Sequence, residues 1–413
     1  MTIDRAKGSF PGASGSTDSA GRPAPSADGD APRVVLAGGG TGGHLAPGVA
    51  LAEALVRLDE RARIFFLVAG REIEASFLGD GRFGWESLGD PSRGGGPLGK
   101  GWGVGRSFCR SFAVLQREKP QVMVGLGGGA SVGPILASRV ARRPRIVLLE
   151  QNATPGRATR ILARLADRIH LAFPLPELSL PARVDARLSG NPVRSSTRPL
   201  PRGEAIRRLG LDPDRRTLVV LGGSQGARSL NARVTAAVGD LGPALAGIQI
   251  VHVSGRADED CVARAYSARG VDGHVLAFCQ DMGALYGAAD LLLSRAGGTT
   301  VAEILQGRVP SILVPYPWHR DRHQFVNARR VEEAGLGVLV EEAHLGADFF
   351  RRVVIPRLHD VVRSSLPEGD APVAAADIVA RDVLELASAS PVGRIIRGWR
   401  PETSGCETSR SRR

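Results

Sequence analysis

The feature that most constrains the fold is a repeated unit of apolar strand, glycine-rich turn and helix. Residues 33–37 (RVVLA) form a short apolar run that leads into GGGTGGH at 38–44 and then into a helical pattern. Residues 217–221 (TLVVL) lead in the same way into GGSQGAR at 222–228 and a second helical pattern. This alternation predicts parallel sheets covered by helices on both faces.

The same rhythm divides the chain in two. It lapses at 190–201, where prolines gather, which indicates an interdomain connection. We therefore expect an α/β protein with two Rossmann-like domains, at 32–193 and 194–390. The polar, glycine- and serine-rich segments 1–31 and 391–413 are expected to be disordered. The other expected strands are 63–68, 121–126, 145–149, 248–253, 274–278, 290–294 and 311–314.

Charge and composition restrict the class of protein. The net charge of +12 indicates an anionic partner. Most of the arginines are spread along the whole chain, so we favour an anionic membrane surface or a phosphorylated substrate over nucleic acid. No apolar run approaches the roughly 18 residues needed to span a bilayer, and no secretory signal is visible. The four cysteines lack ligand spacing, which is typical of reduced thiols in a cytoplasmic protein.

The first glycine turn matches a phosphate-binding pattern. Gly38, Gly40 and Gly43 satisfy G-x-G-x-x-G between a strand and a helix, although a plain tight turn would also explain them. A dinucleotide site would also need an acidic residue at the end of the second strand. The strand 63–68 is followed by no carboxylate before Glu72, which argues against NAD.

The second half carries two further glycine turns after strands. In 222–228 the backbone amides and the Ser224 hydroxyl are suited to a pyrophosphate. In AGGTTVAE at 296–303, Glu303 falls one or two turns into a helix, where it would accept hydrogen bonds from a ribose diol. The alternative is that Glu303 is only a solvated helical carboxylate. Two such turns in one domain favour a nucleotide spread over the carboxyl ends of parallel strands.

Polar residues stand at other strand ends and in the connection. Asn152 follows a strand, where ligands collect, and Arg194 lies between the domains. His319 and His323 share one helix face, but no third ligand is evident, so we expect no metal.

Six motifs in order closely resemble the MurG family of bacterial N-acetylglucosaminyltransferases. The resemblance runs from about residue 33 to 386 and implies a GT-B fold, in which the two sheets face each other across a cleft. It implies inverting transfer of GlcNAc from UDP-GlcNAc to the 4-hydroxyl of MurNAc on undecaprenyl-pyrophosphoryl-MurNAc-pentapeptide (lipid I). The products would be UDP and lipid II for peptidoglycan, made without a cofactor by a peripheral protein at the cytoplasmic face of the inner membrane. The motifs are GGGTGGH, LLEQNATPG, SGNPVR, GGSQGAR, AGGTTVAE and DRHQFVNA.

Residue by residue, the resemblance also implies a site. Two departures from the family are present. Gly129 replaces the family's aromatic residue in GGGASVGP at 127–134, which puts any acceptor contact there in doubt, and a short Arg-Gly-Lys-Gly loop is altered to a glycine-rich run at 92–103. The implied contacts are Thr41, Gly42 and Gly43 to the sugar and diphosphate side, Asn152 and Gln324 to the sugar, Arg194 and Ser224 to the pyrophosphate, the Cys279 backbone to uracil, and Gly298, Thr299, Thr300, Val301, Ala302 and Glu303 to the nucleotide and ribose.

Two mechanistic expectations follow. An inverting transfer needs a base, and His44 is our candidate because it ends the first glycine turn; a structural histidine capping the helix is the alternative. From 102 to 119, Phe108 and Phe112 recur at helical spacing beside Arg106 and Arg110, which suits an anionic membrane interface. A helix packed on the first sheet explains the same pattern.

Three other functions stay open from the sequence. Another GT-B transferase would use a different acceptor. A UDP-GlcNAc 2-epimerase would need acid/base carboxylates in the cleft, and the motifs do not match that family. A non-catalytic UDP-sugar binding module would bind without turnover.

Overall fold

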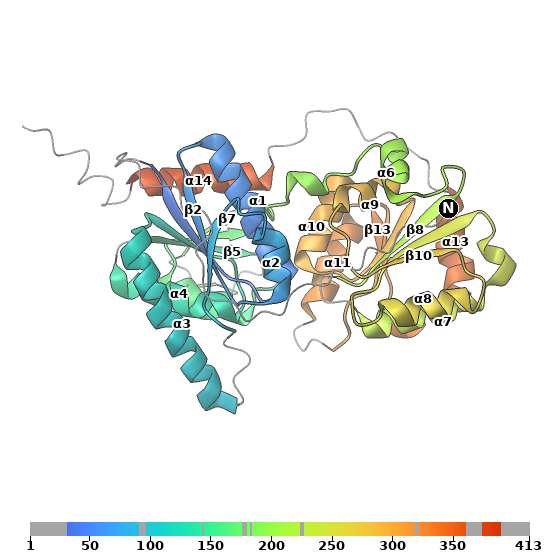
Figure 1. Cartoon of the computed structure of the whole chain (residues 1–413), viewed down its shortest axis with the longest axis horizontal. Coiled ribbons are helices and arrows are strands. Elements are labelled where there is room, and N and C mark those ends of the chain that lie inside the picture. The colour runs from blue at the N-terminus through green and yellow to red at the C-terminus, as the bar shows by residue number, and fades with distance from the viewer. Residues whose placement is uncertain are drawn as a thin grey trace, which may run out of the picture.

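The computed structural model describes residues 31–90, 96–142, 144–175, 180–181, 184–223, 227–318, 322–360 and 374–389. They form two α/β domains that lie side by side (Figure 1). The first domain contains a 7-stranded sheet of order β3-β2-β1-β4-β5-β6-β7, and the second a 6-stranded sheet of order β10-β9-β8-β11-β12-β13. All of the strand pairs in both sheets are parallel, which confirms the predicted architecture.

In the first domain, helices cover both faces of the sheet. On one face α1 and α14 pack on the buried strand residues, and on the other α3 and α4 do so. The strands are β1 (Arg33–Ala37), β2 (Arg63–Val68), β3 (Gly84–Ser87), β4 (Val122–Gly125), β5 (Arg145–Glu150), β6 (Arg168–Leu171) and β7 (Asp185–Leu188). The helices are α1 (Gly42–Leu58), α2 (Glu72–Leu78), α3 (Gly96–Glu118), α4 (Val132–Ala141) and α5 (Arg157–Leu162).

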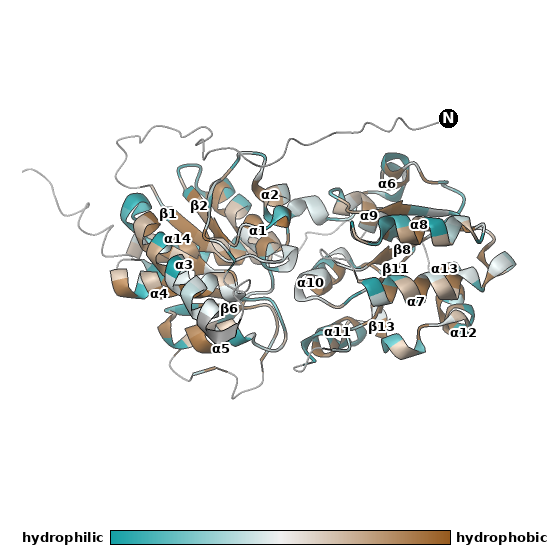
Figure 2. Ribbon diagram, turned by 60° about the horizontal axis from the view of Figure 1, so that its bottom comes forward, coloured by the Kyte–Doolittle hydropathy of each residue, from teal (hydrophilic) through white to brown (hydrophobic). Residues whose placement is uncertain are grey.

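The second domain repeats this layering. Helices α6, α9, α10 and α11 cover one face, and α7, α8 and α13 the other, with apolar strands between them (Figure 2). The strands are β8 (Arg216–Leu221), β9 (Ile248–Val253), β10 (Gly273–Leu276), β11 (Leu291–Ser294), β12 (Ser311–Leu313) and β13 (Gly337–Leu339). The helices are α6 (Arg202–Leu209), α7 (Arg228–Gly239), α8 (Glu259–Ser267), α9 (Met282–Ala288), α10 (Gly298–Gly307), α11 (His323–Glu333), α12 (Ala347–Phe349), α13 (Ile355–Asp360) and α14 (Ala375–Ala389).

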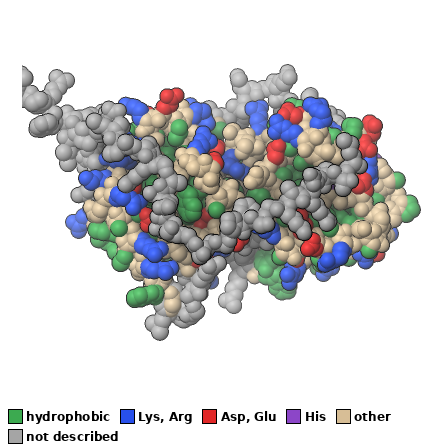
Figure 3. Space-filling model, viewed as in Figure 1, with side chains coloured by type: hydrophobic (Ala, Val, Ile, Leu, Met, Phe, Trp, Pro, Cys, Tyr) green, Lys and Arg blue, Asp and Glu red, His purple; other side chains and the backbone are tan. Residues whose placement is uncertain are grey.

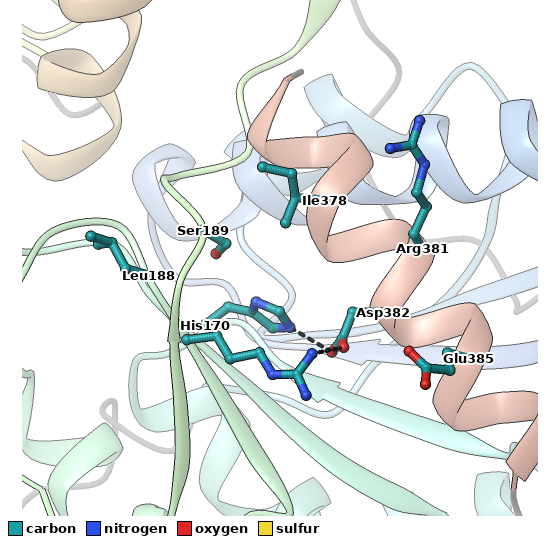
Figure 4. A pocket seen from close by; sticks show the side chains of 8 residues that line it. His170, Leu188, Ser189, Ile378, Arg381, Asp382 and Glu385 are labelled. Atoms are coloured by element: carbon teal, nitrogen blue, oxygen red, sulfur yellow. Dashed lines mark hydrogen bonds and ion pairs between the residues drawn. The ribbon is translucent and has the colours of Figure 1, made fainter. Parts of the chain in front are cut away.

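The last helix returns to the first domain. Although the sequence places α14 with the second domain, its apolar face is buried against the first sheet and α1 (Figure 1). Its Asp382 pairs with His170 Nε2 at 2.9 Å (Figure 4). Asp382 also accepts hydrogen bonds from Arg187 at 2.6 Å and from Arg168. An amphipathic helix can be recognised from its pattern, but the pattern does not say which sheet it covers.

Helix α1 begins earlier than predicted. The apolar pattern of the sequence predicts a helix over 47–58, but the helix already includes Gly42, so the second half of GGGTGGH is its first turn. Proline has no N–H, so the carbonyl four residues earlier loses its intrahelical partner. That carbonyl belongs to Gly43.

One part of helix α3 packs on the first sheet, and another part is exposed. Val114 and Leu115 are buried on the first sheet, whereas Trp102 near the start of the helix is 81% exposed. The N-terminal half of α3 projects below the domain (Figure 1), where basic and hydrophobic side chains lie close together (Figure 3). Within the described ranges, no helix is long and apolar enough to cross a membrane.

Candidate active site

The first and second domains meet where β5 and β11 end. Gly298 opens α10 directly against the loop after β5, and a Cβ at this position would lie 2.2 Å from the Gln151 carbonyl oxygen. Only glycine fits such an approach. The motifs LLEQNATPG and AGGTTVAE, far apart in sequence, are therefore in contact.

A hydrogen bond joins the first glycine turn to α10. Thr299 Oγ1 donates to the Gly43 carbonyl oxygen at 2.6 Å, the carbonyl that Pro47 leaves without an intrahelical partner. Asn191, in the connection between the domains, donates through Nδ2 to Thr299 Oγ1 at 3.4 Å. Gly43 and Thr299, both predicted substrate-binding residues, thus form a hydrogen bond between the two domains.

Asn327 on α11 forms a second bridge between the domains. It is fully buried, and its Oδ1 accepts from the Ala153 N–H at 2.9 Å. Its Nδ2 donates to Asn152 Oδ1 at 3.2 Å and to the Ala296 carbonyl oxygen at 3.1 Å. The two ends of this amide therefore hold Ala153 and Asn152, the predicted sugar contact, against the second domain.

Glu150 fixes the same loop from the other side. Its Oε1 accepts from the Asn152 backbone N–H at 3.0 Å and from Asn152 Nδ2 at 3.1 Å, and its Oε2 accepts from the Gly156 N–H at 2.9 Å. The carboxylate is 3% exposed. The Asn152 side chain is oriented by Glu150 and Asn327 together.

His44 lies in the first turn of α1, half-buried beside this loop. Its Nδ1 is 3.0 Å from Thr41 Oγ1. The ring lies against Gly127, whose φ of +89° suits glycine and where a Cβ would come within 3.2 Å of His44 Cδ2. If Nδ1–H donates to Thr41, the Nε2 lone pair is free to accept a proton.

The surroundings of His44 favour its neutral form. Burial lowers the pKa of the imidazole; the nearby Glu150 carboxylate acts in the opposite direction, and His323 lowers the pKa further. A neutral imidazole is the form that a general base requires.

Glu303 lies in a buried cluster in the second domain. Tyr286 on α9 donates its hydroxyl to Glu303 Oε2 at 2.6 Å. Burial raises the pKa of Glu303, while the Tyr286 hydrogen bond and the Arg194 charge lower it. At 9% exposure, Glu303 is buried, which excludes the alternative of a solvated helical carboxylate.

Arg194 reaches from the interdomain connection to both domains. Its guanidinium carbon lies 4.9 Å from the centre of the Phe77 ring on α2, and its charge acts on Glu303 and Tyr286. Its buried Nε has no hydrogen-bond partner among the described residues. Cys279 is buried close to Tyr286, and burial raises the pKa of its thiol.

The other predicted site residues are placed as follows. Gln324 Oε1 accepts from the Tyr316 N–H at 2.9 Å, at the start of α11. Gly42 lies in the first turn of α1, and Thr300, Val301 and Ala302 lie in the first half of α10. Ser224 and His319 lie outside the described residues. Within the described part of the chain, no group of His, Cys, Asp and Glu has the arrangement of a metal site.

The first glycine turn already holds an internal anion. Glu74 is 1% exposed, and its Oε1 accepts from the Gly40 N–H at 2.7 Å. Its Oε2 accepts from Gly70 and Arg71 at 2.6 and 2.9 Å. A carboxylate of the protein therefore accepts from the Gly40 amide that a dinucleotide pyrophosphate would need. This contact argues against NAD binding, as does the lack of a carboxylate at the end of the second strand.

The sequence prediction missed three residues at this boundary. Asn327 stood within the motif DRHQFVNA, but its bonds depend on a partner in the other domain. Glu150 stood within LLEQNATPG, yet a carboxylate after a strand does not reveal that it will hold its own loop. Tyr286 lies in a helix of small and apolar residues, so its pattern indicated only a core position.

The two parallel-sheet domains, with polar residues from both meeting at one boundary, define the fold class, GT-B. A solved MurG structure from Acinetobacter baumannii covers 87% of this chain and 99% of its own, with a TM-score of 0.60 and 22% identity. A UDP-GlcNAc 2-epimerase from Methanocaldococcus jannaschii covers 86% and 99%, with a TM-score of 0.56 and 12% identity. At these identities both comparisons show the fold alone.

Sequence comparisons identify the family. Models of the glycosyltransferase family 28 N-terminal and C-terminal domains match residues 34–171 and 217–356. The UDP-N-acetylglucosamine–N-acetylmuramyl-(pentapeptide) pyrophosphoryl-undecaprenol N-acetylglucosamine transferase of Myxococcus xanthus is 34% identical over 330 residues, 78% of this chain and 83% of its own. This chain belongs to glycosyltransferase family 28 and, within it, to the MurG family.

Proposed function

We propose that this protein transfers GlcNAc from UDP-GlcNAc to the 4-hydroxyl of MurNAc on lipid I, with inversion at the anomeric carbon, and releases UDP. The observation that carries the proposal is family membership, since the Myxococcus xanthus relative is named as this transferase. Contacts that join five of the six motifs at the domain boundary support it. The sixth motif, GGSQGAR, lies partly outside the described residues. A UDP-GlcNAc 2-epimerase shares the fold, but the motifs of this chain do not match that family.

His44 is the proposed general base. It takes the proton from the acceptor hydroxyl as the oxygen attacks C1 of GlcNAc, and the bond from C1 to the diphosphate oxygen breaks. The electron pair of that bond leaves with UDP. The Thr41 contact at Nδ1 and the lowered pKa support this role, because they favour a neutral ring with Nε2 available.

The donor is proposed to lie along the domain boundary. Glu303 accepts from the ribose hydroxyls, the Cys279 backbone meets uracil, and Arg194 with Ser224 balances the diphosphate charge. GlcNAc then lies between Asn152 and Gln324, near the first glycine turn. Support comes from the clustering of Cys279, Arg194 and Glu303 around Tyr286, and from the bonds that bring Asn152 to α11. The remaining proposed contacts are Thr41, Gly42, Gly43, Gly298, Thr299, Thr300, Val301 and Ala302.

The lipid-linked acceptor requires contact with a membrane, and we propose that the projecting half of α3 provides it at the cytoplasmic face of the inner membrane. Exposed Trp102 would insert among the headgroups, and the arginines of α3 would meet anionic lipid. The net charge of +12 favours the same surface.

Incubation of the protein with UDP-GlcNAc, with and without a lipid I analogue, tests the proposal. We expect UDP to be released only when the acceptor is present. Formation of UDP-ManNAc would instead identify an epimerase, and binding without turnover would identify a UDP-sugar binding module. Release with a different lipid acceptor alone would identify another transferase.

A further inference from the structure

Tyr286 is a buried tyrosine that the proposed reaction does not use. Its side chain is 2% exposed within the core of the second domain, yet its hydroxyl donates to the predicted ribose-binding carboxylate, Glu303 Oε2, at 2.6 Å. A buried phenol hydroxyl needs a polar partner, and phenylalanine would fill the same volume without one. The hydroxyl therefore raises the question of what the hydrogen bond does for Glu303.

The bond determines how Glu303 is presented. Tyr286 holds Oε2 from α9, while Oε1 has no hydrogen-bond partner among the described residues. A hydrogen bond to one oxygen restrains the orientation of the carboxylate and leaves its second oxygen available to a donor. A ribose diol supplies such donors. Fixing the carboxylate before the ligand arrives lowers the entropy lost on binding.

The bond also favours the ionised carboxylate. Burial raises the pKa of Glu303, and Tyr286 and Arg194 act against this rise. Tyr286 is itself kept protonated because burial and the Glu303 charge raise its pKa well above the usual value, with Cys279 adding to this and Arg194 opposing it. A protonated Glu303 would offer one acceptor oxygen fewer to the diol.

We propose that Tyr286 is a positioning residue for nucleotide recognition: its hydroxyl orients the Glu303 side chain toward the ribose hydroxyls of the uridine nucleotide. This inference rests on the proposed function, because it takes Glu303 as the ribose contact. It adds a residue on α9 to a site whose other expected contacts lie in loops and at helix starts.

The test is calorimetric titration of UDP and 2′-deoxy-UDP into the full chain, at several pH values. Tyr286→Phe removes only the hydroxyl, and Tyr266→Phe is the matched control, because Tyr266 is also buried in this domain and its hydroxyl bonds His252. We expect Tyr286→Phe to bind UDP about tenfold more weakly, as for loss of a charge-assisted hydrogen bond. Its preference for UDP over 2′-deoxy-UDP should shrink. As the pH is lowered, the variant should lose UDP binding at a higher pH than the wild type, because Glu303 without the Tyr286 bond is protonated more easily. Tyr266→Phe should change none of these.

The variant Glu303→Gln distinguishes failure of the inference about Tyr286 from failure of the proposed nucleotide site. If Glu303→Gln weakens UDP binding while Tyr286→Phe keeps wild-type affinity, pH dependence and discrimination, the inference is overturned and the proposed site stands. If the wild type binds no UDP, or Glu303→Gln binds it unchanged, the proposed site is overturned together with the inference. In the Glu303→Gln background, adding Tyr286→Phe should leave the pH dependence unchanged; a further shift would contradict the inference. Thermal unfolding of each variant checks that it is folded.

Discussion

Thr299 donates its hydroxyl to the carbonyl oxygen of Gly43 across the domain boundary, at 2.6 Å. The carbonyl is available because Pro47, four residues further on, has no N–H to offer it. The proline interrupts the hydrogen bonds of α1 at the point where the second domain supplies a replacement. This relationship links a sequence feature, a proline within a helix, to the way the two domains are held together.

Replacing Thr299 tests this bond. Thr299→Val keeps the side-chain shape but removes the donor, so we expect KM for UDP-GlcNAc to rise about fivefold, as for loss of one neutral hydrogen bond. Thr299→Ser keeps the hydroxyl and should stay within about twofold of the wild type. Steady-state kinetics with a lipid I analogue measures both. Equal KM values for the valine and serine variants would show that the bond contributes nothing to donor binding.

Asn327 should matter for both stability and activity. Asn327→Ala leaves the Ala153 N–H and the oxygens of Asn152 and Ala296 without this partner, at a cost of about 1–3 kcal/mol in free energy of unfolding. We expect kcat/KM for the donor to fall at least about tenfold, because Asn152 loses its orientation.

Asn327→Asp separates the two ends of the amide. It keeps the acceptor for Ala153 but points a carboxylate oxygen at the two oxygens that Nδ2 now bonds. We expect it to be at least as damaging as alanine. Wild-type kinetics for Asn327→Asp would mean that the bond to Asn152 does not position the sugar contact.

The pH dependence of kcat/KM should follow the protonation of His44. Its pKa is lowered mainly by burial, so the neutral base is present at neutral pH and is lost on the acidic side of the usual histidine value. We predict that kcat/KM is flat near pH 7 and falls only below about pH 6.5. His44→Ala should lower kcat at least about tenfold, abolish this acidic limb and leave the Kd for UDP unchanged. Near-normal turnover of the variant would exclude His44 as the base.

His252 should make the fold sensitive to acid. It is fully buried between Asn231 and Tyr266, and burial lowers its pKa from 6.5 to about 4, with Asp258 acting in the opposite direction. A lowered pKa in the folded state gives stability that is present above pH 6.5 and is lost as the pH falls toward 4. The loss attributable to His252 is about 3 kcal/mol between pH 7 and pH 4.

Urea denaturation of the wild type and of His252→Gln at the two pH values measures this loss. The variant should be less stable at pH 7, because its bonds to Asn231 and Tyr266 are altered, but its stability should depend less on pH. Parallel pH dependences would show that His252 is not the responsible group.

Membrane binding should depend on α3. Arg106→Glu with Arg110→Glu should weaken binding to anionic vesicles at least about tenfold, since each basic residue contributes about 1 kcal/mol near such a surface. Trp102→Ser should weaken it further. The control is Arg264→Glu with Arg357→Glu, the same charge change on exposed residues of the second domain. If both pairs behave alike in a vesicle sedimentation assay, α3 is not the membrane contact.

The central strands could be predicted because both of their faces are buried. Runs such as 217–221 are almost continuously apolar and end at glycine turns, so they can be recognised as strands from the sequence alone. Strands β3, β6, β7 and β13 were not predicted: β7 is an edge strand whose four residues are all exposed, and β13 has only three residues. Their pairing depends on neighbours, not on their own pattern.

The candidate site was predicted at the level of which loops take part. Strand ends and glycine turns identified the segments around His44, Asn152 and Glu303, because parallel strands bring their carboxyl ends to one edge. The contacts between the domains were not predictable, since they depend on how two separately folded units meet. Asn327 and Tyr286 gain their importance only from partners on other elements.

The central claim is inverting transfer to one hydroxyl, and the linkage in the product tests it most directly. The disaccharide formed from UDP-GlcNAc and a lipid I analogue can be analysed by NMR. We predict a β-linked GlcNAc on the 4-oxygen of MurNAc, and no product from an acceptor that lacks the 4-hydroxyl. An α-linkage, attachment at another hydroxyl, or transfer to the 4-deoxy acceptor would contradict the account.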